Sequence, residues 1–213
     1  FRHNNDGTTY SSSYGTQDTG RMRTQRDFIS ALLKQTLKLS NISKIGELID
    51  IANNNIETNI PLDTIKDYIP YAVEFSTDNL KTATLPGEPK EMNGVWLYLT
   101  DDDEAQAMVA QYFFDCPTED EVTNEMPTLQ ILNGTSDFSN LEEVVNKYKE
   151  KGYNILKVGN TESKVKQTKI TNRTKQTSET VTEVKNVIKE NAKTETGKDT
   201  EDVDFTITIG QDY

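Results

Sequence analysis

The hydrophobic positions in the first part of the chain follow a helical period and predict three helices. Between about Gly20 and Leu39 the apolar residues recur three or four positions apart, which is the spacing of one helix face. A second such stretch runs from Ile42 to about Asn53. A third opens at Pro61, a residue suited to a first helical turn, and reaches Pro70. Residues 4–19 have no apolar period and predict an exposed loop.

The pattern then changes to that of strands. Leu80–Leu85 alternates and ends at Pro86-Gly87, and Val95–Leu99 is a short apolar run after the turn dipeptide Asn93-Gly94. These two segments predict a pair of strands. Asp101–Phe114 predicts a helix with acidic residues in its first turn, where the helix dipole favours negative charge.

An acidic segment bounded by prolines follows this helix. Such a segment is typical of a linker between domains. We therefore expect one domain in residues 1–115, a linker in residues 116–126 and a second domain in residues 127–213.

Six elements are predicted in residues 127–213. They are strands at Thr128–Leu132, Tyr153–Val158, Gln167–Asn172 and Val203–Ile209, and helices from Ser139 to Gly152 and from Ser178 to Ala192. The first helix opens with the capping-box sequence Ser139 to Glu142, and the polar run 193–202 is expected to be a loop. The order βαββαβ predicts a split-βαβ sheet with both helices on one face. The fold class of the whole chain is therefore α/β in the broad sense (α+β).

Composition limits the function classes. The chain of 213 residues has a formal net charge of -12, which argues against a protein that binds nucleic acid over its whole surface. The single cysteine, Cys116, excludes an intramolecular disulfide and a cysteine-rich zinc site. The only histidine is His3, so a Ser-His-Asp triad would depend on that residue. No run of about 18 apolar residues predicts a transmembrane helix.

Positive charge gathers at the predicted start of the first helix, in Gly20–Arg26. Free N–H groups and the helix dipole already make that end positive, so Arg21, Arg23 and Arg26 are unfavourable there unless an anion binds. Backbone donors and guanidinium groups together form a natural phosphate or pyrophosphate site, to which Arg2 can add a fourth cation. The sequence leaves open the alternative that these arginines pair with surface carboxylates.

These motifs resemble the LytR-CpsA-Psr family. Its members carry an Arg-x-Arg strand, a variable loop and a D-x-G-R-x-x-R-Q stretch that opens a helix. Phe1-Arg2-His3 and Asp18–Gln25 stand at these places in this chain. Residues 127–213 resemble the domain often found at the C-terminus of these proteins. Further marks of the family are Thr58-Asn59, Leu85-Pro86-Gly87, Leu132–Thr135, Lys151-Gly152-Tyr153 and Ile209–Tyr213.

The resemblance implies the C-terminal part of an LCP (LytR-CpsA-Psr) phosphotransferase domain in residues 1–115 and a LytR C-terminal domain in residues 127–213. It implies Mg²⁺-dependent transfer of teichoic-acid or capsule-type glycopolymers from polyprenyl pyrophosphate to peptidoglycan, outside the bacterial membrane. The parent protein is expected to be anchored by a helix that precedes Phe1. The 213 residues alone are expected to be inactive, and no nucleic-acid partner is expected.

The resemblance also assigns residues. Arg21 and Gln25 match family positions that contact the lipid pyrophosphate, and Arg21 is expected to be catalytic. Arg2 matches the second arginine of the strand pair. Thr24 stands where the family has arginine, and Arg23 is expected to substitute for it. The family's metal-binding aspartates match no position here, so no Mg²⁺ ligand is assigned.

Three function classes compete. The first is the phosphotransferase, and the second is a non-catalytic surface module whose terminal domain binds wall polymer or a protein partner. The third is a transcriptional attenuator, which is the weakest because no helix-turn-helix and no basic face outside residues 1–40 are present.

Overall fold

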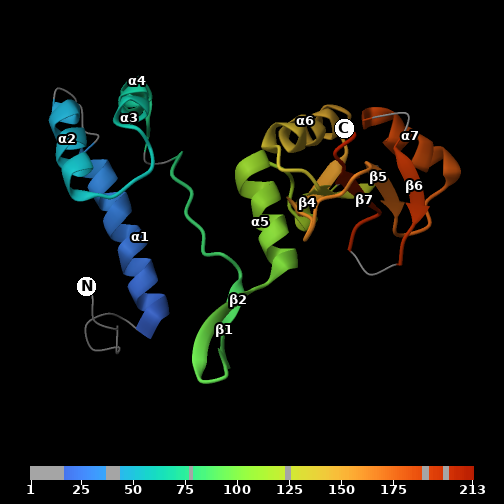
Figure 1. Cartoon of the computed structure of the whole chain (residues 1–213), viewed down its shortest axis with the longest axis horizontal. Coiled ribbons are helices and arrows are strands. Elements are labelled where there is room, and N and C mark those ends of the chain that lie inside the picture. The colour runs from blue at the N-terminus through green and yellow to red at the C-terminus, as the bar shows by residue number, and fades with distance from the viewer. Residues whose placement is uncertain (1–16, 37–43, 77–78, 123–125, 189–191, 199–201) are drawn as a thin grey trace. The chain divides into compact units, whose positions relative to one another are not determined.

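The computed structural model describes residues 17–36, 44–76, 79–122, 126–188, 192–198 and 202–213. Arg2 and most of the predicted loop 4–19 lie outside these ranges. The chain divides into two compact units, Phe1–Ala83 and Thr84–Tyr213 (Figure 1).

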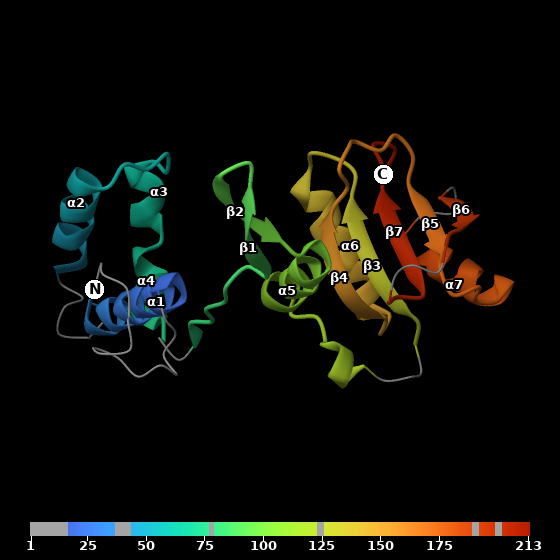
Figure 2. The same ribbon diagram turned by 90° about the horizontal axis from the view of Figure 1, so that it is seen from below.

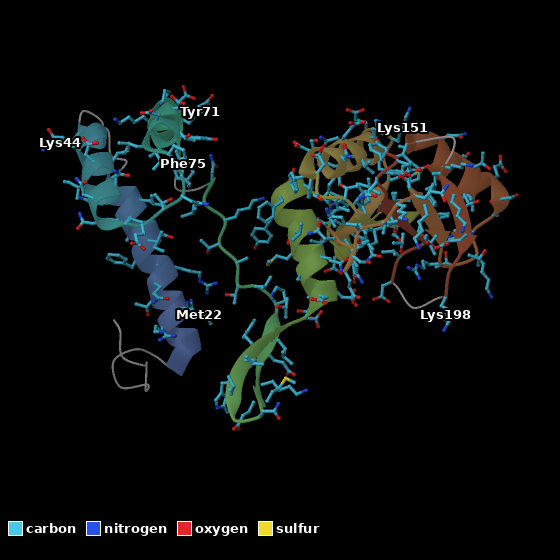
Figure 3. The ribbon with its side chains drawn as sticks, viewed as in Figure 1. Met22, Lys44, Tyr71, Phe75, Lys151 and Lys198 are labelled. Carbon is cyan, nitrogen blue, oxygen red and sulfur yellow. The ribbon has the colours of Figure 1, made fainter. Side chains whose placement is uncertain are left out.

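Helices make up the described part of the first unit. They are α1 (Gln17–Thr36), α2 (Ile45–Asn55), α3 (Leu62–Asp67) and α4 (Ile69–Glu74). The helix predicted from Pro61 to Pro70 is divided at Tyr68, because Pro70 has no N–H for the hydrogen bond of a continuous helix. Among the side chains described in this unit, none of the apolar ones is fully buried and many are exposed. Examples are Tyr71 and Phe75, which are labelled in Figure 3.

A β-hairpin opens the second unit. Strand β1 (Gly87–Met92) pairs antiparallel with β2 (Val95–Thr100). Asn93 and Gly94 both have positive φ, 54° and 78°, as the two central residues of a type I′ turn require. This two-residue turn selects the residues just before it as the partner strand. The strand predicted at Leu80–Leu85 is therefore wrong, and the true partner is the charged segment that follows it.

The rest of the second unit is one mixed sheet with helices. Helix α5 (Asp102–Phe114) and the short 3-10 helix η4 (Glu119–Glu121) precede it. The remaining elements are β3 (Thr128–Asn133), α6 (Phe138–Glu150), β4 (Asn154–Asn160), β5 (Lys169–Asn172), α7 (Ser178–Ile188), β6 (Lys193–Thr196) and β7 (Phe205–Ile209). The α+β class predicted from the sequence is confirmed.

The strand order is β4-β3-β7-β5-β6, which can be followed in Figure 2. Strands β3 and β4 are parallel and directly paired. The expected split-βαβ arrangement is therefore wrong, because in a split unit another strand separates the two. The edge strand β6 lies in the segment 193–202 that was predicted as loop. Its sequence Lys-Thr-Glu-Thr has no apolar residue, so the hydrophobic pattern carried no trace of it.

The core lies between the sheet and helices α6 and α7. Its fully buried side chains are Leu129, Ile131, Val144, Val145, Tyr148, Ile155, Val158, Ile170, Val184, Phe205, Ile207 and Ile209. The hydroxyl of Tyr148 donates to the carbonyl of Val184 at 2.9 Å and joins the two helices. Helix α6 is capped by Asp137, whose carboxylate accepts from the N–H of Ser139 at 2.9 Å. The predicted capping box is thus wrong, since Ser139 already lies inside the helix.

Helix α5 packs against β4. The Nε2 of Gln130 on β3 donates to the Oε1 of Gln106 at 2.7 Å, and the Nζ of Lys157 on β4 lies 3.2 Å from the carboxylate of Asp103. At its other end, Phe114 is buried and its ring lies 6.0 Å from that of Phe138. Helix α5 is therefore packed into the same unit as the C-terminal sheet.

Candidate pyrophosphate site

Helix α1 positions the described residues of the predicted anion site. Arg21 and Gln25 are four residues apart and therefore share one face of the helix. Arg23 is turned roughly 200° around the axis from Arg21, so it lies on a different face. Met22, labelled in Figure 3, marks this turn of α1. The structure thus brings Arg21 and Gln25 together and separates Arg23 from them.

The side chains of this turn differ in exposure. Arg21 is half-buried and its Nε atom is buried, whereas Arg23 and Gln25 are exposed. Thr24 bends back on the helix, because its hydroxyl donates to the carbonyl of Gly20 at 2.9 Å. The residue that stands where the family has arginine is therefore engaged with the backbone. Arg21 combines partial burial with a polar neighbour, Gln25, at the helical spacing of four residues.

The beginning of α1 differs from the sequence prediction. The helix already includes Gln17, so Arg21 lies beyond the four residues whose N–H groups have no partner within the helix. The prediction that Arg21 and Arg23 lie beside the free amides of the helix start is therefore wrong. The predicted anion contact of Arg21 would rest on its guanidinium group and not on its backbone N–H.

The other acidic and nucleophilic candidates have structural roles. The carboxylate of Asp101 accepts from the N–H of Glu104 at 3.0 Å and caps α5. Asp103 pairs with Lys157 on β4. Burial raises the pKa of the Cys116 thiol to about 11, so the thiol stays protonated at neutral pH and is a poor nucleophile. These groups pack or cap within the second unit.

The residues present do not fit a divalent metal ion. In the described ranges, no group of three or more His, Cys, Asp or Glu side chains could hold one. Mg²⁺ usually takes oxygen ligands from carboxylates. No step of the function is therefore assigned to a metal at these residues. In the same ranges, no helix combines the length and apolar character needed to cross a membrane.

Sequence analysis missed one feature that has the form of a binding site. An open cavity of about 520 Å³ lies between α7 and the edge strand β6, with Ser178, Lys185 and Thr194 in its lining. The missed strand forms one of its walls. A loop prediction for residues 193–202 could not place these hydroxyl groups opposite a helix.

Two family models match the chain. The model of the LytR-CpsA-Psr family matches residues 10–113. That of the LytR cell envelope-related transcriptional attenuator matches residues 127–213. Together they take in most of the chain. The chain therefore belongs to the LytR-CpsA-Psr family, whose members are associated with the cell envelope.

Curated relatives match part of the chain. Polyisoprenyl-teichoic acid–peptidoglycan teichoic acid transferase TagU of Oceanobacillus iheyensis is 33% identical over 88 residues, which are 41% of this chain and 27% of that protein. The protein of the same name from Bacillus subtilis is 28% identical over 85 residues, 40% of this chain and 28% of its own. Biofilm regulatory protein A of Streptococcus mutans is 32% identical over 79 residues, 36% of this chain and 19% of its own.

The matched segments span less than a third of each of these relatives. No solved structure matches the chain.

Proposed function

We propose that this chain is part of a phosphotransferase that moves a teichoic-acid or capsule-type glycopolymer from polyprenyl pyrophosphate to peptidoglycan. Residues 1–115 would supply part of the transferase domain, and residues 127–213 a terminal domain. The reaction would take place on the outer face of the bacterial membrane, with the parent protein held there by a segment before Phe1. The family membership and the printed names of the two TagU relatives support the proposal.

The observation that carries the proposal is the shared face of Arg21 and Gln25 on α1. A guanidinium group offers two parallel N–H donors to phosphate oxygens, and the amide of Gln25 adds a neutral donor one helical turn away. Arg2 and Arg23 complete the proposed set, with Arg2 outside the described residues and Arg23 on another face of α1.

The proposed chemical role of Arg21 is electrostatic. A hydroxyl group of peptidoglycan would attack the phosphate that carries the glycopolymer and give up its proton. Polyprenyl phosphate would leave, accumulating negative charge as the bond between the two phosphates breaks. A fixed guanidinium stabilises that charge without reorganising. Partial burial of Arg21 strengthens this effect, since the surrounding protein screens charge less than water does. The Mg²⁺ of the family is proposed on the resemblance alone, with its ligands elsewhere than in the described residues.

The test is binding of polyprenyl pyrophosphate, in detergent micelles, to the 213-residue chain and to its variants. Arg21→Ala is expected to weaken binding by ~10²-fold, the usual effect of losing one such donor. The affinity of Arg21→Lys should lie between those of the parent chain and Arg21→Ala. An ammonium group keeps the charge but lacks the two parallel donors of the guanidinium. The melting temperature should stay nearly unchanged, since the side chain is only half-buried.

Lys34→Ala is the matched control. Lys34 is a cation in the last turn of the same helix, so its loss changes the net charge equally without touching the proposed site. Unchanged binding in Arg21→Ala, or an equal loss in Lys34→Ala, would refute the assignment. The 213 residues are expected to bind the lipid without transferring the polymer.

A second candidate function applies to the terminal domain. Residues 127–213 have their own buried core and an open polar cavity. In their described part no cluster of candidate catalytic groups is present. We infer that this domain binds cell-wall polymer or a partner and positions the protein. Retention of the chain on peptidoglycan sacculi, compared with a chain that ends at residue 126, tests this role.

A further inference from the structure

The sheet of the second unit contains the same strand–helix–strand arrangement twice. β3-α6-β4 and β5-α7-β6 each end in a directly paired parallel strand, and β7 lies between the two halves. The first strand of each half ends in an asparagine. The side-chain amide of Asn133 donates to the carbonyl of Asp137 at 3.1 Å, and that of Asn172 donates to the carbonyl of Gln176 at 2.9 Å. The outer strands β4 and β6 are therefore equivalent edges of one domain.

The two edges differ in what covers them. Helix α5 lies against β4, and its last turn reaches α6 through the rings of Phe114 and Phe138. At β6, no element in the described ranges takes the equivalent place. The cavity of about 520 Å³ opens there, between α7 and β6. One half of the domain thus has its groove filled by the chain itself, and the other half has it open.

The residues that line the cavity are mostly polar. Among the described residues that line it, Val181 is the one aliphatic side chain. An amphipathic helix such as α5 buries a continuous apolar face, and this groove offers none. The hydroxyl-bearing residues at its walls are Ser178, Thr182, Thr194 and Thr196.

Few charged residues line the cavity. Lys185 lines it from α7 and Glu195 from β6. The carboxylate of Glu195 accepts from the Nζ of Lys169 at 2.9 Å and from the hydroxyl of Thr171 at 3.0 Å. A polyanion such as a glycerol phosphate polymer requires an excess of cations, which these side chains do not supply. The lining therefore favours a neutral ligand with many hydroxyl and amide groups.

Several lining groups are available to such a ligand. Thr194 and Thr196 are two residues apart on β6 and so point to the same face. In the described part of the chain, neither hydroxyl has a hydrogen-bond partner, and the same holds for Ser178. The loop that joins β5 to α7 forms a further wall of the cavity. It is held by a hydrogen bond from the N–H of Gln176 to the side-chain oxygen of Asn172 at 2.9 Å.

We propose that this cavity binds a short neutral segment of the cell-wall glycan, an N-acetylated amino-sugar oligosaccharide. The inference rests on the second candidate function, in which the terminal domain binds wall polymer. It names the place and the chemical class of that ligand. Hydroxyl groups of Ser178, Thr194 and Thr196 would bond the sugar hydroxyl and acetamide groups, with Lys185 donating at the rim.

The test uses the ¹⁵N-labelled 213-residue chain titrated with the β-1,4-linked tetramer of N-acetylglucosamine. The expected result is a set of amide shifts centred on α7 and β6. The double variant Thr194→Val and Thr196→Val keeps the shape of both side chains and removes both hydroxyls. It should weaken binding by about ten-fold. Thr100→Val, an exposed strand threonine of β2, is the matched control and should bind as the parent does.

Three outcomes would overturn the proposal: shifts absent at saturating tetramer, shifts centred on other elements, or equal binding in the double variant. Stronger shifts at the same amides with a glycerol phosphate oligomer would also overturn it, because the ligand class would then be anionic. The lipid pyrophosphate assay reports on α1 in the other unit. A failed saccharide titration therefore leaves the transferase proposal standing, and a failed lipid assay leaves the cavity proposal to its own test.

Discussion

The two units of the chain use the same kinds of apolar residue in different ways. In the second unit (Thr84–Tyr213, below called the sheet domain) Phe205 and Tyr148 are fully buried. In the first unit Phe28 is 54% exposed and Tyr71 is 69% exposed. Burying a large apolar side chain contributes about 1.5–3 kcal/mol. In its described part, the first unit gains little of this. The described helices of this unit bury little apolar surface against one another, and short helices alone are marginal in water.

The comparison shows where the candidate pyrophosphate site lies. Arg21 and Gln25 lie on the helix whose apolar face is largely exposed, while the best-packed part of the chain carries the cavity between α7 and β6. Large exposed apolar surfaces mark places where another domain or chain packs. The face of α1 that carries Phe28 and Leu32 is therefore a candidate surface for such packing.

The largest effect is expected from matched truncations of phenylalanine in the two units. Phe205→Ala removes a fully buried ring and should lower the free energy of unfolding by about 3–5 kcal/mol. Phe28→Ala removes an exposed ring and should change it by less than about 0.5 kcal/mol. Urea unfolding followed by circular dichroism measures both.

Ile207→Val is the milder variant in case Phe205→Ala does not fold, with an expected loss of about 1 kcal/mol. A loss for Phe28→Ala as large as that for Ile207→Val would contradict the comparison. It would mean that α1 is packed into a cooperative core of its own.

The next effect tests whether α5 belongs to the sheet domain. A methyl group added at Gly159 on β4 would lie 2.8 Å from the Cγ of Gln106, and Gln106 is held by its hydrogen bond from Gln130. Gly159→Ala should therefore cost about 1–2 kcal/mol. In the background of Gln106→Ala the same change should cost almost nothing, because the Cγ is gone. A double-mutant cycle measures this coupling.

A stabilising effect of Gly159→Ala would contradict the packing of α5 against β4. Alanine in place of an unobstructed strand glycine stabilises by about 0.4–1 kcal/mol through the unfolded chain. If Gly159→Ala stabilises the chain, Gln106 does not lie over Gly159 in solution.

Several elements could be predicted from the sequence because the spacing of their apolar residues follows the period of a helix or a strand. Helices α1, α2, α5, α6 and α7 and strands β2, β3, β4, β5 and β7 all coincide with predicted segments. Strands β1 and β6 could not, since Gly87–Met92 and Lys193–Thr196 are edge segments with little or no apolar alternation. Strand β1 pairs with β2 because the Asn93-Gly94 turn joins them. Strand β6 pairs with β5 because α7 connects the two as parallel strands.

The candidate sites show the same limit. Arg21 could be found because its motif is local, and the helix spacing that joins it to Gln25 is written in the sequence. The start of α1 could not be predicted, because the helix begins earlier than its first apolar residue. The cavity between α7 and β6 depends on Ser178 and Thr194 lining the same groove, and no pattern along the chain encodes that proximity.

A smaller effect is expected from the caps of α5 and α6. Asp101 and Asp137 each accept a backbone N–H at the start of their helix. Replacing either with alanine should lower the melting temperature of the sheet domain by a few degrees. Thermal unfolding followed by circular dichroism measures the shift. If Asp101→Ala leaves the main transition unchanged while Asp137→Ala lowers it, α5 unfolds separately from the sheet.

The smallest effect is a pH dependence confined to the sheet domain. Burial by itself raises the pKa of Asp204, but hydrogen bonds outweigh it and hold the pKa below its ordinary value of 3.8. The donors are the hydroxyl of Thr174 at 2.6 Å, the N–H of Thr128 at 2.9 Å and the Nε2 of Gln176 at 2.8 Å.

A carboxylate with a lowered folded-state pKa stabilises the fold above its unfolded pKa, and this contribution is lost as the pH falls through the folded value. The melting temperature of the sheet domain should therefore drop as the pH is lowered past 3.8. Asp204→Asn cannot titrate, so its melting temperature should start lower at neutral pH and fall less steeply in acid. Arg21→Ala, in the unit without this network, should leave the acid slope unchanged. Equal slopes for Asp204→Asn and the parent chain would show that Asp204 does not couple the start of β7 to β3 and to the loop before α7.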